Sequence, residues 1–188
     1  MPAARARAQR LDLPALLGED SIGVEGRAAD SDHLALKVWL RLLACSTQIE
    51  TEIRRRLRAR FGITLPRFDY LAQLYRHPEG LRMNMLSRYM MVTGGNITGL
   101  TDELEKDGLV LREADASDRR STRIVLTEAG RRALERIAAE HEAWVVELFA
   151  GTSAQSQEAL YEQLGQLRVQ LARKSPLLSS TTVTKEKS

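Results

Sequence analysis

The spacing of apolar residues along this chain changes from helical to alternating between residues 109 and 126. Up to Gly108 these residues recur at steps of three and four, which is typical of amphipathic helices. The stretches LVLRE and TRIVLT then alternate, and the polar, basic segment ADASDRRS lies between them. After Thr127 the helical spacing returns. The sequence therefore predicts a mainly α fold with a small β-hairpin that has a long, polar tip.

Four helices are predicted before the hairpin, and the first is the longest. It spans about 32–61, with Ser31 or Asp32 as its N-cap and Gly62 after its last residue. A second helix opens at Thr64 and closes at the turn HPEG. Two short helices follow, over about 84–91 and from Thr93 to Gly108, and they predict a helix-turn-helix.

Two further helices follow the hairpin, and their apolar stripes need a partner surface. Thr127 caps the first of them, and Leu160, Leu164, Leu167 and Leu171 form the seam of the second. We predict three parts: a flexible basic arm (1–30), a folded domain (31–174) and a disordered tail (175–188). Within the domain we expect a winged helix-turn-helix over about 64–126 and dimerisation helices over about 32–61 and 127–173.

The charge pattern indicates a polyanionic partner. The net charge is only +3 with a pI of about 9.2, but arginines cluster in TEIRRRLRAR and SDRRSTR. One cysteine excludes an internal disulfide and a cysteine-based metal site, and no secretory signal is evident, so we expect a cytoplasmic protein. There is no phosphate-binding glycine loop, nucleophile elbow or metal cluster, so we expect neither an enzyme nor a cofactor.

The helix predicted after Thr93 carries three glycines, in MVTGGNITGL, although each interior glycine costs a helix about 1 kcal/mol. In a winged helix this second short helix enters the major groove, where a missing side chain lets the backbone approach phosphates and bases. Asn and Thr beside them favour A·T contacts. Alternatively, the glycines accommodate close packing between helices. The expected DNA-facing residues are Thr93, Gly94, Gly95, Asn96, Thr98 and Thr101.

The hairpin carries a family motif. In LEKDGLVLREADASDRRSTRIVLTEAG, Asp118 and Arg120 are followed by Leu126, Thr127 and Gly130. This pattern resembles the wing of the MarR-type transcriptional regulators. The resemblance implies a homodimer in which the first, fifth and sixth predicted helices interlock and two winged helices bind a pseudopalindromic operator. Helices with the broadest apolar stripes are the same three, which agrees with this interpretation.

The resemblance also implies roles for residues of the wing and of the first helix of the motif. Arg120 is matched to a minor-groove or flanking phosphate contact, with Arg119 beside it. Asp118 would orient a wing arginine through a charge-assisted pair. Ser87 is placed for a phosphate contact. The chain departs from many relatives at positions 94 and 99, where they carry longer, often basic side chains.

The segment MVTGGNITGLTD is similar to the recognition helix of a MarR branch that governs aromatic acid catabolism, including hydroxycinnamate degradation. Some members respond to aromatic acids and others to their acyl-CoA thioesters. The resemblance implies a repressor that such an effector releases from DNA. Aromatic and basic residues of the first two helices are candidates for the effector site, although the aromatic ones also suit a core. These candidates are Trp39, Arg41, Arg67, Phe68 and Tyr70.

Two other functions fit the sequence. One MarR-type branch senses peroxides through a single cysteine in its first helix, and Cys45 occupies such a helix here, although we expect a buried and inert thiol at this position. The other is an effector-free architectural protein that binds DNA by shape and phosphate.

Overall fold

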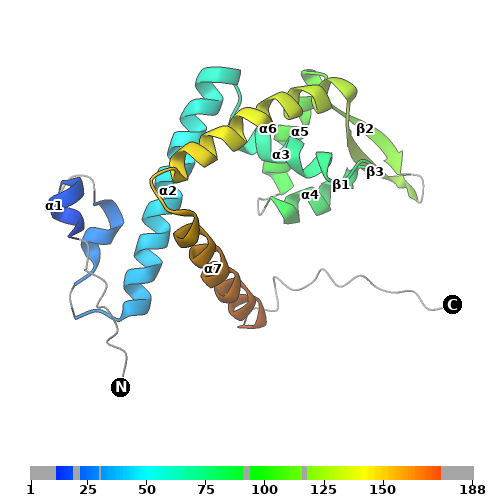
Figure 1. The fold of residues 1–188 in the computed structure, drawn as a ribbon. Coiled ribbons are helices and arrows are strands. Elements are labelled where there is room, and N and C mark those ends of the chain that lie inside the picture. Colours follow the sequence, from blue (N-terminus) through cyan, green and yellow to red (C-terminus); the bar gives the residue numbers. More distant parts are fainter. Residues whose placement is uncertain (1–11, 19–21, 30, 91–93, 116–117, 175–188) are drawn as a thin grey trace. The chain divides into compact units, whose positions relative to one another are not determined.

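The computed structural model describes residues 12–18, 22–29, 31–90, 94–115 and 118–174 (Figure 1). The chain divides into two compact units, and the boundary lies inside helix α6, between Ala138 and Ala139. The elements, in chain order, are α1 (Leu13–Leu17), the 3-10 helix η2 (Gly23–Arg27), α2 (Leu34–Phe61), α3 (Leu65–Tyr75), β1 (Leu81–Arg82), α4 (Met83–Tyr89), α5 (Gly94–Lys106), β2 (Val110–Asp115), β3 (Asp118–Leu126), α6 (Glu128–Phe149) and α7 (Ala154–Lys174).

Helix α2 ends as the sequence predicts but begins later. Gly62 adopts the left-handed conformation, with φ of +68°, and its N–H donates to the Arg58 carbonyl. The predicted N-cap is wrong, because the helix begins at Leu34 and His33 is its N-cap. Asp32 does not cap it, and its carboxylate instead accepts the Ala29 N–H at 2.8 Å in the preceding turn.

The start of the described chain packs against α2. This part of the chain, which the sequence predicts to be a flexible arm, contains the short helix α1 and the 3-10 helix η2. Residues of η2 contact α2, and Arg41 Nε donates to Glu25 Oε1 at 2.7 Å. Part of the chain before residue 31 is thus joined to the first long helix.

The wing is a three-stranded antiparallel sheet in the order β1-β3-β2. The sequence predicts only the hairpin β2-β3, and it missed β1, a strand of two residues that is too short to show any periodicity. Gly80 makes this strand possible. Its φ is +81°, and a Cβ there would lie 2.5 Å from Val125 Cγ1 and 2.7 Å from the Ile124 carbonyl oxygen.

The hairpin is longer than predicted. Strand β2 continues to Asp115 and β3 starts at Asp118, so most of ADASDRRS belongs to the strands. The pairing of the two strands shifts in register between Ala114 and Asp115. The predicted long tip is therefore wrong in its length, because β2 and β3 include most of these polar residues.

The core of the first unit joins the helix-turn-helix, the sheet and parts of the two long helices. Thr127 connects the sheet to α6: its hydroxyl donates to the Gly108 carbonyl at 2.7 Å and accepts the Gly130 N–H at 3.0 Å, which confirms the predicted N-cap. Tyr75 ties α3 to α6, since its hydroxyl donates to Glu135 and Arg131 lies over its ring. The most deeply buried core side chains are Leu57, Tyr70, Leu71, Leu74, Leu86, Ile97, Thr101, Leu104, Val110 and Ile124.

Candidate nucleic-acid interface

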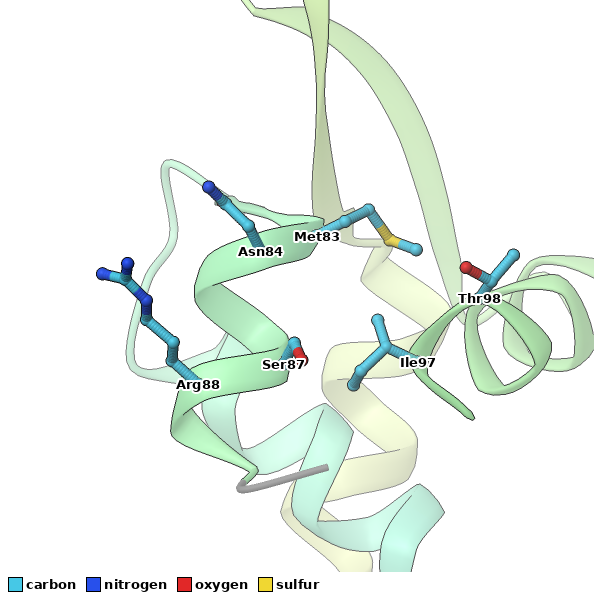
Figure 2. Close-up of a pocket in the computed structure, with 6 residues that line it drawn as sticks. All are labelled: Met83, Asn84, Ser87, Arg88, Ile97 and Thr98. Carbon is cyan, nitrogen blue, oxygen red and sulfur yellow. The ribbon is translucent and has the colours of Figure 1, made fainter. Parts of the chain in front are cut away.

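Helices α4 and α5 form the predicted helix-turn-helix, and an open groove of about 520 Å³ lies between them. Figure 2 shows Ile97 projecting from α5 toward α4, with Met83 and Ser87 on the side of α4 nearer to it. Asn84 and Arg88 point away from α5. Ser87 is half-buried, at the position where the sequence predicts a phosphate contact, and it lines this groove together with the apolar Met83 and Ile97.

The glycines of α5 occupy its outermost line. Because a helix turns about 100° per residue, Gly95 and Gly99 point roughly opposite to Ile97, which is fully buried. Both glycines are exposed, neither has a positive φ, and a Cβ built on either would meet no atom within 4 Å. Close packing within the protomer therefore does not explain them. Because these glycines have no side chains, the backbone of α5 is exposed along this line, and the exposed side chains of Asn96 and Thr98 lie on either side of it.

Charge divides α5 along its length. Its first half carries no ionisable side chain, whereas Asp102, Glu103 and Glu105 lie in the second half. The helix dipole makes the N-terminal end positive, so the first half suits a polyanion and the acidic second half does not. Arg112 of β2 forms ion pairs with Asp102 and Glu105, and the hydrogen bond to Asp102 in particular raises the pKa of its guanidinium. These ion pairs attach strand β2 of the wing to the C-terminal half of α5.

Thr101 does not face the groove, and this part of the prediction is wrong. Its side chain is fully buried, and its hydroxyl lies 2.6 Å from the Tyr70 hydroxyl and 2.8 Å from the Ile97 carbonyl oxygen. Thr101 follows Ile97 by four residues and precedes Leu104 by three, so helical spacing places it on the buried face. That spacing was the signal in the sequence, and the polar character of threonine obscured it.

The remaining residues predicted to bind DNA or to orient the wing lie at the ends of the described segments or just beyond them. Thr93 is outside the described residues, and Gly94 is the first residue of α5. Asp118, Arg119 and Arg120 form the start of β3 next to the turn of the wing. The backbone thus brings the wing arginines to the end of the hairpin, which is the part of a winged helix that reaches along DNA.

The five candidate effector residues do not form one cluster within a protomer. Phe68 and Tyr70 are core residues, and burial raises the pKa of the Tyr70 phenol, so it stays neutral. Arg67 forms an ion pair with Asp107, just after α5. Trp39 is exposed on the N-terminal part of α2, about 30 Å along this helix from the loop that leads to Arg67. Arg41 lies near Trp39 and pairs with Glu25.

Three further observations on the described part of the chain concern a reactive thiol, a metal site and a membrane-spanning helix. Cys45 is exposed, so the expectation of a buried thiol is wrong. Among the described residues, no group of three or more His, Cys, Asp and Glu side chains is arranged to hold a metal ion. In the same residues, no helix combines the length and the apolar character that crossing a membrane requires.

A helix-turn-helix followed by a hairpin, one strand of which pairs with a short third strand, defines a winged-helix protein of the kind that binds DNA. The sequence model of the MarR family matches residues 63–122. The chain is 30% identical over 125 residues, 65% of its own length and 71% of the relative, to the transcriptional activatory protein BadR of Rhodopseudomonas palustris. The chain belongs to the MarR family of transcriptional regulators, as the wing motif predicts.

Solved structures of two family members are similar to this fold. The structure of Sco3205 from Streptomyces coelicolor in complex with DNA has a TM-score of 0.63 and 27% identity, and the match covers 74% of this chain and 91% of that one. The structure of CouR from Rhodococcus jostii RHA1 bound to p-coumaroyl-CoA has a TM-score of 0.63 and 25% identity, with 82% and 100% covered. The mainly α winged-helix fold class is confirmed, and so is the expectation that this regulator is not an enzyme.

Proposed function

We propose that this regulator is a homodimeric repressor that binds a pseudopalindromic operator through the N-terminal half of α5 and the wing, and that an aromatic acid or its acyl-CoA thioester releases it. The observation that carries the DNA contact is the pair of exposed glycines, Gly95 and Gly99. They cost helix stability, they relieve no packing within the chain, and they expose the backbone on the line of α5 opposite the core.

Insertion of α5 into the major groove of DNA would explain these glycines. A helix without side chains on its outer line can approach base edges and phosphates closely, and the free N–H groups at its N-terminus attract a phosphate. Asn96 can pair with adenine, and the methyl group of Thr98 can contact that of thymine. The similar protein Sco3205 was solved with DNA, which supports the same use of this fold here.

Exposed apolar side chains on the long helices support the homodimer. All of α7 is described, and none of its residues is buried. Its exposed residues include the large apolar side chains Tyr161, Val169 and Leu171. On α2, Leu34 and Trp39 are 74% and 58% exposed. A monomer rarely leaves this much apolar helix surface in water, and a second copy would cover it. Two copies would also place two α5 helices on successive turns of DNA.

The effector proposal rests on two relatives and on one ion pair. The structure of CouR was solved with p-coumaroyl-CoA bound. In this chain, the segment MVTGGNITGLTD resembles the recognition helix of the aromatic-acid branch. Arg67 pairs with Asp107 at the C-terminal end of α5. A ligand carboxylate or phosphate that binds Arg67 would compete with Asp107 for it, and displacement of Asp107 would free one end of α5 and shift the spacing of the two DNA-binding helices.

The first experiment is fluorescence anisotropy of the purified protein on DNA from upstream of its own gene and on random DNA, with and without hydroxycinnamates and their CoA thioesters. Specific binding that one of these compounds relieves supports the whole proposal. Specific binding that none of them relieves keeps the regulator and rejects the effector. Equal affinity for both DNAs rejects the operator and favours an architectural role.

Arg120→Ala tests the wing contact, with Arg132→Ala as its matched control. Both changes remove one arginine charge, but Arg132 is exposed on α6, where it pairs with Glu128. Loss of one phosphate contact should weaken operator binding and lower the salt dependence of log K by about one unit in Arg120→Ala alone. Equal effects of the two changes would mean that only net charge matters.

Two alternatives have specific support. The relative BadR is a transcriptional activatory protein, so activation by this chain is the second candidate, and transcription from the bound promoter with and without effector distinguishes the two. Exposure of Cys45 makes thiol sensing the other. We expect Cys45→Ser to keep its effector response and peroxide to leave operator binding unchanged. Peroxide release of the wild type that the serine variant lacks would favour the thiol sensor.

A further inference from the structure

The core of the helix-turn-helix contains a polar contact at which three helices meet. The Thr101 hydroxyl of α5 lies 2.6 Å from the Tyr70 hydroxyl of α3 and 3.4 Å from Met83 Sδ of α4. It also donates to the Ile97 carbonyl, one turn earlier in α5, at 2.8 Å. Tyr70 and Thr101 are each 0% exposed, so water does not compete for these bonds.

The direction of the hydroxyl pair follows from counting protons. Thr101 has one hydroxyl proton, and the Ile97 carbonyl is a better acceptor than the Met83 thioether, so the proton points to the carbonyl. Thr101 must then accept from Tyr70. The chain of bonds runs from the Tyr70 O–H to Thr101 and on to the Ile97 carbonyl, and every member is satisfied.

A directional bond constrains α5 in a way that its apolar neighbours do not. Ile97 and Leu104 bury their side chains above and below Thr101, but apolar contact is non-directional and tolerates small rotations of a helix. A hydroxyl bond weakens steeply when its angle changes. The rotation of α5 also decides whether Asn96 and Thr98 flank the outward line of glycines, because each residue is fixed about 100° from the next.

We propose that Tyr70 and Thr101 are positioning residues that set the rotation of α5 and thereby the specificity of operator binding. The inference rests on the proposed function, since it assumes that α5 reads the operator. Neither side chain touches DNA. They act through the orientation of the residues that do.

The proton assignment predicts unequal effects of two nearly isosteric changes. Thr101→Val removes the acceptor and leaves the buried Tyr70 O–H without its present partner, so the cost of an unsatisfied donor favours a movement of α5 that restores a hydrogen bond. Tyr70→Phe removes the donor and with it the link between α3 and α5, but Thr101 keeps its bond to Ile97, so α5 loses a constraint on its rotation without being driven to a new one. Thr101→Ser retains the hydroxyl and should retain the geometry.

The test is the ratio of operator affinity to random-DNA affinity, measured by anisotropy on protein that circular dichroism shows to be folded. We expect Thr101→Val to lower this ratio about tenfold, Tyr70→Phe about two- to threefold, and Thr101→Ser hardly at all. Affinity for random DNA should not change, because it depends on phosphate charge and not on the rotation of α5. Thr51→Val is the matched control, since it removes an exposed hydroxyl that donates to the Thr47 carbonyl of α2.

A purely structural role predicts a different result. Thr101→Val would then lower the melting temperature, while the folded protein would keep the wild-type ratio, and this outcome would overturn the inference. Should Thr101→Val not fold, a wild-type ratio in Tyr70→Phe would overturn it equally, and a reduced ratio in Tyr70→Phe with a normal one in Thr101→Ser would support it. A wild type that does not prefer its operator would reject the proposed function, and the inference with it.

Discussion

Replacement of Gly99 by alanine should change stability and operator binding in opposite directions. Gly99 lies inside α5, has no positive φ, and leaves space for a Cβ that would meet no atom of the protomer within 4 Å. Alanine is about 1 kcal/mol more favourable than glycine in a helix interior. We therefore expect Gly99→Ala to raise the free energy of unfolding by about 1 kcal/mol and the melting temperature by about 2–4 °C.

The same methyl group should weaken DNA binding. It points along the outward line of α5, into the space that the proposed complex gives to the operator. Overpacking of a close interface costs about 1–3 kcal/mol, so operator affinity should fall at least about fivefold. Urea unfolding and fluorescence anisotropy on the same preparation measure both quantities.

Gly165→Ala is the matched control for this experiment. Gly165 lies in the interior of α7, where a Cβ also meets no atom of the protomer within 4 Å, so alanine should stabilise the protein there. Because the proposed function places α7 at the dimer surface, the comparison is made on protein that size-exclusion chromatography shows to be the same dimer as the wild type, and operator affinity should then be unchanged. A Gly99→Ala variant that is more stable and binds its operator as tightly as the wild type would refute the close approach of α5 to DNA.

Two further changes test the packing and the electrostatics of the fold. Gly130→Ala should lower the free energy of unfolding in urea by about 3 kcal/mol, because the added methyl would overlap the Leu109 carbonyl; a loss below about 1 kcal/mol would contradict this packing. Hydrogen bonds from Arg55 and then Arg56 lower the pKa of Glu52 to about 2 from an ordinary 4.5, so the stability that Glu52 contributes is present above pH 4.5 and lost toward pH 2. Wild type and Glu52→Gln should converge in free energy of unfolding over that range, and a constant difference would disprove the linkage.

Most of the fold could be predicted because the ends of its helices are set by the chemistry of single residues. Gly62, Pro66 and Thr127 end or begin helices for reasons that act within a few residues, and the structure has helix ends at all three. Strand β1 could not be predicted, because two residues carry no pattern and their pairing with Ile124 is decided 40 residues later in the chain. The sequence also could not reveal that Asp32 is already occupied by the Ala29 N–H.

Part of the candidate site could be predicted from the sequence and part could not. The exposed face of α5 followed from the positions of Gly95, Asn96 and Gly99, since helical spacing alone assigns a face. The error at Thr101 came from judging a residue by its polarity when its spacing from Ile97 indicated burial. That error concealed the buried bond to Tyr70, which no local pattern predicts because the two residues are 31 positions apart.

The joint made by Leu126, Thr127 and Gly130 has a consequence for how such regulators are compared within one genome. These residues belong to the motif that identifies the family, yet they hold the sheet against α6 and leave base readout to other residues. Paralogues that share all of them can therefore serve unrelated promoters. Cross-talk between two such regulators should depend on the few outward positions from Gly95 to Gly99, so a pair that differs there can coexist in one cell however similar the rest of the winged helix is.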